Sequence, residues 1–270
     1  MKRGAFTLVE LVVVLAVIAV HTHLAVRELA HLRDGRLSDA ADRQLEEIKS
    51  AVYSVGPDGV ARGFLVDMGR LPKAEDGTLS ELWLMPTGTL RYAVRPATEE
   101  NLVPEARGKG LSKDSVFVPT GWKGPYLRLP FGVDHLRDPW GNPIEAEDDA
   151  GLPRVFTTNG FVTAVAHYGP SARAAGERRL SFFPEEREPA GRLVVSLESA
   201  STGAVKNNAK ITLYSPVNGL ISAIETNITE SVAVFEGVMP GRKVLFDSVT
   251  DGAHAVDVAP GDNLIVVKIP

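Results

Sequence analysis

The chain contains no cysteine in its 270 residues. Disulfides and thiolate metal sites are therefore excluded, and stability has to come from packing and from contacts between subunits. An excess of positive charge is also missing, because 29 Lys and Arg face 34 Asp and Glu, for a net charge of −5. This balance argues against nucleic-acid binding. Glycine-rich phosphate loops of the P-loop and dinucleotide types do not occur either.

The composition is that of a globular protein, with 44% apolar and 23% charged residues. A chain of this length forms one large domain, or two small ones plus a tail. It lacks the residue patterns of common active sites: paired carboxylates with a plausible cleft, a Ser-His-Asp order, or a zinc ligand set. The sequence therefore predicts that the protein is not an enzyme.

The N-terminal stretch is the most unusual part of the chain. Lys2 and Arg3 precede an apolar segment, and no polar side chain occurs between Leu11 and Val20. The membrane half of the expected helix, 8–26, is about 28 Å long, close to the thickness of the hydrocarbon layer. The two cations predict that the N-terminal end is cytoplasmic.

Three interpretations fit this segment. One is a secretory signal peptide, with Val17-Ile18-Ala19 as a cleavage site, and another is a plain membrane anchor. Neither gains anything from Glu10, whose carboxylate is costly in lipid. The third interpretation, which gives Glu10 a role, rests on the residues around it.

The run Phe6-Thr7-Leu8-Val9-Glu10 resembles the processing and methylation motif of type IV pilins and type II secretion pseudopilins. The resemblance implies cleavage by a prepilin peptidase, N-methylation of the new first residue, and pairing of Glu10 with the terminal amine of a neighbouring subunit. Cutting after Gly4 keeps the family's glycine but makes Glu10 the sixth residue. Cutting between Ala5 and Phe6 makes Glu10 the fifth, so we expect a leader of residues 1–5 and N-methyl-Phe6.

The apolar pattern continues beyond the membrane segment and predicts one helix over 6–55. Its spacing of three and four residues predicts one apolar face, formed by Leu29, Leu32, Leu37, Ala41, Leu45, Ile48 and Val52. The run Gly56-Pro57-Asp58-Gly59 is a helix stop. His21 and His23 stand two residues apart on this helix, so they point to different sides and cannot chelate a metal together.

The region 56–189 is expected to form a globular part with a short helix near Thr78–Leu84. Two motifs in it resemble the major pseudopilin of type II secretion: Gly124-Pro125-Tyr126-Leu127, and Asp138-Pro139-Trp140-Gly141-Asn142-Pro143. The second motif predicts a tight turn capped by Asp138 and Asn142 and anchored to the core by Trp140. Short antiparallel strands are expected at 143–145, 154–158 and 161–166, the last two joined by a hairpin turn at Asn159-Gly160.

The same resemblance implies a calcium loop after these strands, at 167–177. The family's loop carries aspartates, whereas this one has Arg173 and Glu177 and no Asp. Calcium requires several oxygen ligands, usually including carboxylates. Calcium is possible only by resemblance, and we expect no metal site and no cofactor.

The last part of the chain, 190–270, follows a charged linker and consists of short β runs. Strands are expected at 192–198, 209–214, 222–226, 231–235, 243–248, 253–258 and 264–269, with turns about every ten residues, the signal of a β-sandwich. The run Val234-Phe235-Glu236-Gly237-Val238-Met239-Pro240-Gly241 resembles transthyretin-like or carboxypeptidase regulatory-like sandwiches. Such modules bind partners or add bulk, and they imply no catalysis.

These observations predict an α+β protein: a long membrane-spanning helix packed on a small antiparallel sheet, followed by an all-β sandwich. The resemblance implies a structural subunit of a type II secretion or type IV pilus-like filament. Its partners would be copies of itself, other pseudopilins, the prepilin peptidase and an inner-membrane assembly platform. It would cross the inner membrane once, with its globular part in the periplasm or otherwise outside that membrane. The alternative is a pilin-anchored protein that binds adhesion, carbohydrate or other partners through the sandwich. The type of filament, and a major, minor or tip position, stay open.

Mass spectrometry of the mature N-terminus tests the processing hypothesis. We expect a first residue of N-methyl-Phe6, because cleavage there places Glu10 fifth in the mature chain. A first residue at Val20 would instead identify a signal peptide and contradict the filament interpretation.

Overall fold

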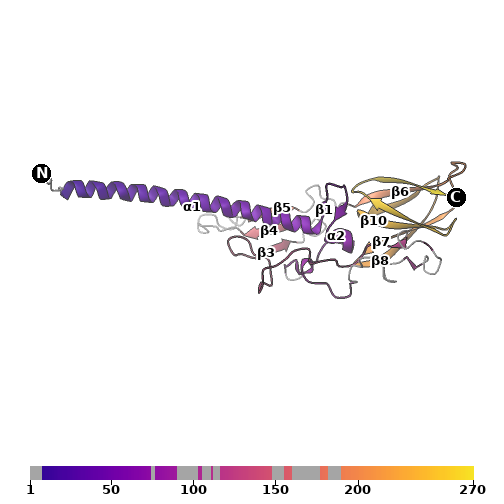
Figure 1. The fold of residues 1–270 in the computed structure, drawn as a ribbon, viewed down its shortest axis with the longest axis horizontal. Coiled ribbons are helices and arrows are strands. Elements are labelled where there is room, and N and C mark those ends of the chain that lie inside the picture. The colour runs from indigo at the N-terminus through magenta and orange to yellow at the C-terminus, as the bar shows by residue number, and fades with distance from the viewer. Residues whose placement is uncertain are drawn as a thin grey trace.

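The computed structural model describes residues 8–73, 77–89, 103–104, 111, 116–147, 155–159, 177–181 and 190–270. Figure 1 shows an elongated molecule, with one long helix extending from a globular body and the C-terminal strands at the opposite end. The chain is α+β, and its sheets are mostly antiparallel.

Helix α1 (Leu8–Val52) contains 45 residues, which corresponds to about 67 Å. It continues through Gly35 and ends three residues before the predicted boundary near Val55. The predicted end was wrong because Ser54 and Val55 form strand β1 (Ser54–Val55), which pairs with β2 (Ala61–Arg62). The run 56–59 is therefore the turn of a small hairpin, closed by a hydrogen bond from Gly59 N to Gly56 O of 2.9 Å.

The predicted single apolar face of α1 is correct only for its last part. Ala41, Leu45, Ile48 and Val52 are buried, whereas Leu29 and Leu32 are 65% and 61% exposed. The predicted residues therefore lie on two faces of the helix rather than one. At 100° per residue, Leu29 and Leu32 lie on the side of the helix away from the buried residues. The apolar residues are spaced helically within 29–32 and within 41–52, but the two sets lie on different sides of α1.

The buried end of α1 packs into the core of the globular body. Leu45, Ile48 and Val52 belong to one apolar cluster with residues of α2 (Phe64–Met68), of the short 3₁₀ turn η1 (Ser80–Leu82), and of a three-stranded sheet. The predicted helix near 78–84 is thus reduced to that turn. Arg70 connects the two short elements, because its guanidinium donates to both Glu81 carboxylate oxygens at 2.6 and 2.7 Å.

The sheet under α1 has the order β3-β4-β5, all antiparallel: β3 (Ile144–Glu147), β4 (Val155–Asn159) and β5 (Glu177–Ser181). The first two strands match the prediction. Strand β5 was not predicted, and Glu177, expected in a loop, is its first residue. Residue 160 of the predicted hairpin turn, the strand at 161–166 and the loop up to 176 lie outside the described residues.

Asp138 is the centre of the turn that leads into β3. Its carboxylate is buried and accepts hydrogen bonds from the backbone N–H of Trp140 (3.0 Å) and of Asn142 (2.7 Å), from the Asn142 side chain (3.1 Å) and from the Thr158 hydroxyl on β4 (2.8 Å). The predicted capping role of Asp138 is confirmed. Trp140 is only half-buried, so the expected anchoring in the core was wrong, and Asp138 takes that place through Thr158.

The C-terminal part is a sandwich of two sheets. One has the order β11-β10-β7-β8 and the other β12-β6-β9, and only the β12–β6 pair is parallel. Their buried residues form a single cluster between the sheets. All seven predicted strands occur: β6 (Gly191–Ser199), β7 (Lys210–Val217), β8 (Leu220–Asn227), β9 (Ala233–Val238), β10 (Gly241–Asp247), β11 (Gly252–Val258) and β12 (Asn263–Ile269).

The four-stranded sheet of the sandwich is also covered on its outer face. Tyr214, Val244 and Phe246 pack there against Val103, Val116 and Val118 of the preceding region. Strand β7 is accordingly buried at six consecutive positions, 211–216, where a two-layer sandwich would show alternation. The sandwich is therefore joined to the globular body through a second apolar core.

We expect replacement of Asp138 by Ala to lower the free energy of unfolding by about 2–3 kcal/mol, because four donors would lose a buried charged acceptor. Thermal unfolding of the full chain in detergent would measure the change. Asp134, exposed in the same connection, provides the control: Asp134→Ala should leave the melting temperature nearly unchanged. Equal effects of the two substitutions would contradict this role of Asp138.

Candidate functional site

The largest exposed apolar surface of the described chain is the first half of α1. Apolar residues from Leu8 to Val26 project from the helix with no covering contact, and the segment is long and apolar enough to cross a membrane. Glu10 lies in the first turn, where a carboxylate is favoured by the helix dipole. Gly4, Ala5 and Phe6, the predicted processing residues, lie outside the described residues.

The polar side chains at the far end of this apolar segment bond to their own helix. His21 Nδ1 lies 2.8 Å from Val17 O, and the Thr22 hydroxyl donates to Ile18 O at 2.8 Å. Both contacts satisfy polar groups locally, which lowers the cost of placing them at the edge of a membrane. Within the described ranges, no group of three or more His, Asp or Glu side chains is placed to hold a metal ion.

The Gly124-Pro125-Tyr126 motif lies at the edge of the globular body's core, with Tyr126 half-buried against it and Pro125 exposed. Tyr126 meets Phe64 and Trp122 edge-on, at ring centroid distances of 5.5 and 6.1 Å. Trp122 donates from Nε1 to the Glu81 carbonyl at 2.8 Å. Gly124 is required here, because a Cβ atom would stand 2.6 Å from the Trp122 ring. The motif is thus an aromatic packing unit.

Tyr126 also connects the motif to a buried carboxylate. Its hydroxyl donates to Asp67 Oδ2 at 2.9 Å and accepts from the Lys123 N–H at 3.0 Å. Asp67 belongs to α2 and is almost completely buried. Burial raises the pKa of Asp67 to about 6, although the Tyr126 hydrogen bond and the charges of Lys123 and Lys243 act in the opposite direction.

Lys243 is the cationic counterpart on the sandwich side. It lies on β10, is completely buried, and its Nζ donates to Pro240 O at 3.4 Å. Burial lowers the pKa of Lys243 to about 7, while the charge of Asp67 raises it. The two opposite charges therefore attract each other across the junction between α2 and the sandwich, and burial imposes a large desolvation cost on both.

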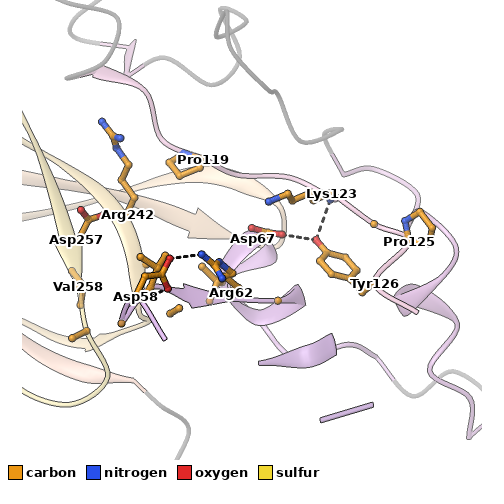
Figure 2. A pocket seen from close by; sticks show the side chains of 18 residues that line it. Asp58, Arg62, Asp67, Pro119, Lys123, Pro125, Tyr126, Arg242, Asp257 and Val258 are labelled. Atoms are coloured by element: carbon orange, nitrogen blue, oxygen red, sulfur yellow. Dashed lines mark hydrogen bonds and ion pairs between the residues drawn. The ribbon is translucent and has the colours of Figure 1, made fainter. Parts of the chain in front are cut away.

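A cleft of about 780 Å³ opens beside this junction. Figure 2 shows Asp67, Lys123 and Tyr126 on one side and Arg242, Asp257 and Val258 on the other, with the Asp58–Arg62 ion pair between them. Its described acidic side chains are Asp58, Asp67 and Asp257, and its basic ones are Arg62, Lys123 and Arg242. The described lining thus carries equal numbers of acidic and basic side chains.

On the sandwich, His254 pairs with Asp247 and closes the turn between β10 and β11. His254 Nε2 lies 2.9 Å from Asp247 Oδ2 among the described residues of the β10–β11 hairpin. Asp247 also accepts from the backbone N–H of Val249 and Thr250 and from the Thr250 hydroxyl. Since the hydroxyl is bonded to the carboxylate and not to the histidine, this arrangement stabilises the hairpin and activates no nucleophile.

The sequence drew attention to the motifs at 124–127 and 138–143, but the buried charges of Asp67 and Lys243 were not predicted from it. Asp67 and Lys243 are far apart in the chain, and neither belongs to a motif. One signal was available: Lys243 alternates with Leu245 along β10, on the face that points into the sandwich. A lysine at an inward position of a strand predicts a buried charge that needs an acidic partner.

No protein-family model matches this chain, and no curated protein matches it at a significant level. The functional interpretation therefore depends on the residues themselves and on their geometry.

The buried pair gives stability a defined pH dependence. The pKa of Asp67 is raised on folding from 3.8, so its burial penalty is absent well below pH 4 and complete above about pH 6. The pKa of Lys243 is lowered on folding from 10.5, so its penalty is complete below about pH 7 and disappears as the pH rises toward 10.5. The contribution of this pair to stability is thus lowest between about pH 6 and 7.

We expect the full chain to gain about 2 kcal/mol from Lys243 between pH 7 and pH 9, since the unfolded lysine holds its proton over that range and the buried one loses it. Replacing Lys243 by Met should remove this rise, as measured by denaturant unfolding at both pH values. Lys210→Met, at an exposed position of β7, is the matched control and should keep it. An unchanged pH dependence in Lys243→Met would show that the ammonium is not the titrating group.

Proposed function

We propose that this chain is a structural subunit of a type II secretion or type IV pilus-like filament, with a β-sandwich at the end of the molecule away from the membrane. The observation that carries the proposal is the division of α1 into two parts. Its first half is apolar on all sides and exposed, whereas its last turns are amphipathic and packed into the core. A helix that is hydrophobic all around belongs in lipid or among other helices.

The position of Glu10 supports assembly over simple anchoring. Its carboxylate lies in an otherwise apolar stretch, and a charge in such a stretch is costly in lipid. A partner of opposite charge removes that cost, and the terminal amine of a neighbouring copy, cut before Phe6, is such a group. In this proposal the prepilin peptidase creates the amine, and copies of the helix associate in the inner membrane at the assembly platform.

The geometry of the two pseudopilin-like motifs is in keeping with a structural subunit. Tyr126 packs among aromatic rings, and Asp138 ties its turn to β4. Neither motif presents a free reactive group at the surface. We propose no calcium or other cofactor in this function, because the loop that would bind calcium in the family has no aspartate here.

The sandwich offers a second candidate function, binding of a protein partner. Leu264, Val194 and Val234 are in register across β12, β6 and β9 and form an aliphatic row on the outer face of the three-stranded sheet. Leu264 is 72% exposed. A row of aliphatic side chains suits a protein partner better than a carbohydrate, which is recognised mainly by polar and aromatic groups.

Replacing Glu10 by Gln should abolish assembly while leaving the fold intact. Loss of one partner of a buried ion pair costs about 3 kcal/mol or more, which lowers assembly by a hundredfold. Filament yield and secretion in cells that express the variant would measure this. Glu47→Gln, on the exposed side of the same helix, should assemble normally. Normal filaments from Glu10→Gln would contradict the proposal.

A further inference from the structure

Among the described residues of the globular body, the aromatic side chain of Phe131 is fully exposed. Phe131 stands at the tip of a turn formed by 130–133, here called the Phe131 turn, in which Val133 N donates to Pro130 O at 3.2 Å. Gly132 has a φ of 77°, the left-handed conformation that such a turn requires at its third residue. The backbone thus holds the ring out from the surface in a defined position.

The base of this turn is attached firmly to the rest of the molecule. Gln44 of α1 donates from Nε2 to the Arg137 carbonyl at 2.8 Å, and Ile144 N donates to Leu136 O at 3.0 Å. Leu136 also packs against the apolar core. An exposed ring on a fixed support loses little conformational entropy on docking, which favours a role in recognition.

A complementary surface lies on α1. Leu29, Leu32, Arg33, Arg36 and Leu37 line a groove of about 400 Å³, here called the Leu29 face. Leu29 and Leu32 point away from the residues of α1 that enter the core, so they are available to another molecule. The groove combines aliphatic side chains with two guanidinium groups, a lining suited to an aromatic ring with a carboxylate beside it.

The Phe131 turn carries such a carboxylate. The side chain of Asp134 is 90% exposed and contacts His135. A hydrogen bond from its own backbone N–H holds the pKa of the Asp134 carboxyl below its usual range. The hydrogen bond and the charge of His135 act in the same direction. An ionised carboxylate therefore follows the exposed ring by three residues, opposite in sign to Arg33 and Arg36.

From this complementarity we propose that the Phe131 turn of one copy docks on the Leu29 face of a second copy. The inference rests on the proposed filament and adds a specific contact between its subunits. The Phe131 turn and the Leu29 face are different surfaces of one chain, so the contact can repeat head to tail from copy to copy, as a filament requires. Phe131 then lies against Leu29 and Leu32, and Asp134 pairs with Arg36, one helical turn beyond Leu32.

The membrane is a less suitable occupant for Phe131. Gln44, which holds the base of the turn, lies about 27 Å along the helix from Val26, where the apolar segment ends. The chain from Arg137 to Phe131 reaches at most about 20 Å even when fully extended. With α1 along the membrane normal, the ring falls short of the lipid of its own anchor, whereas a neighbouring helix lies within reach.

Disulfide crosslinking tests the contact directly, because the chain has no cysteine of its own. Two full-length chains with different tags, Phe131→Cys and Leu32→Cys, are expressed together and oxidised in the membrane. We expect a mixed dimer that contains both tags. Asp34→Cys replaces Leu32→Cys in the control; it lies two residues further, about 200° around the helix, and should crosslink at least tenfold less.

A charge exchange adds an independent readout. Asp134→Arg in the Phe131→Cys chain should lower the yield of mixed dimer several-fold, and Arg36→Asp in the Leu32→Cys chain should restore it. Equal yields with Leu32→Cys and Asp34→Cys, or no restoration by Arg36→Asp, would overturn the docking proposal.

A third cysteine distinguishes failure of this contact from failure of the proposed filament. Val13→Cys lies in the membrane half of α1 and crosslinks wherever copies associate through that half. Crosslinking through Val13→Cys without any product between Phe131→Cys and Leu32→Cys would overturn the contact and leave the filament in place. Absence of both products would overturn the filament itself.

Discussion

The packing of Leu45, Ile48 and Val52 into the globular body is the contact on which the rest of the structure depends. These residues fix the last turns of α1 against α2 and the β3-β4-β5 sheet. Because the helix is continuous, the same contact sets the direction of its exposed apolar half about 40 Å away. In the proposed filament, this contact would set the direction of the apolar half relative to the folded body.

The body and the sandwich are held together by burial on both sides of one sheet. Strands β7 and β10 contact the sandwich core on one face and Val103, Val116 and Val118 on the other. At the junction with α2, Asp67 and Lys243 place opposite charges in a buried setting, where desolvation moves the pKa of each toward neutrality. The apolar contacts supply the stability of the junction, because the desolvation of the two charges offsets much of their mutual attraction.

The conspicuous motifs of this chain have structural roles, whereas its exposed features point to assembly. Tyr126 and Asp138 each satisfy several hydrogen bonds or ring contacts inside the body. The apolar half of α1, the Leu29 face and Phe131 are exposed, and each requires a partner to become buried. A protein with large exposed apolar surfaces gains free energy when association buries them.

The sequence by itself determined the local elements: the long helix, the seven strands of the sandwich, and the capping role of Asp138. Each depends on a short-range pattern, either of period 2 or 3.6 or of turn residues a few positions apart. The tertiary structure decided the rest. Val55 lies outside the helix and pairs with Ala61 in a strand, and Asp138 is buried where Trp140 was expected. Lys243 lies close enough to Asp67 across the junction for the charge of Asp67 to raise its pKa. These outcomes depend on which distant segments share one interior. The inward position of Lys243 on its strand predicts a buried charge, but no local pattern identifies Asp67 as its partner.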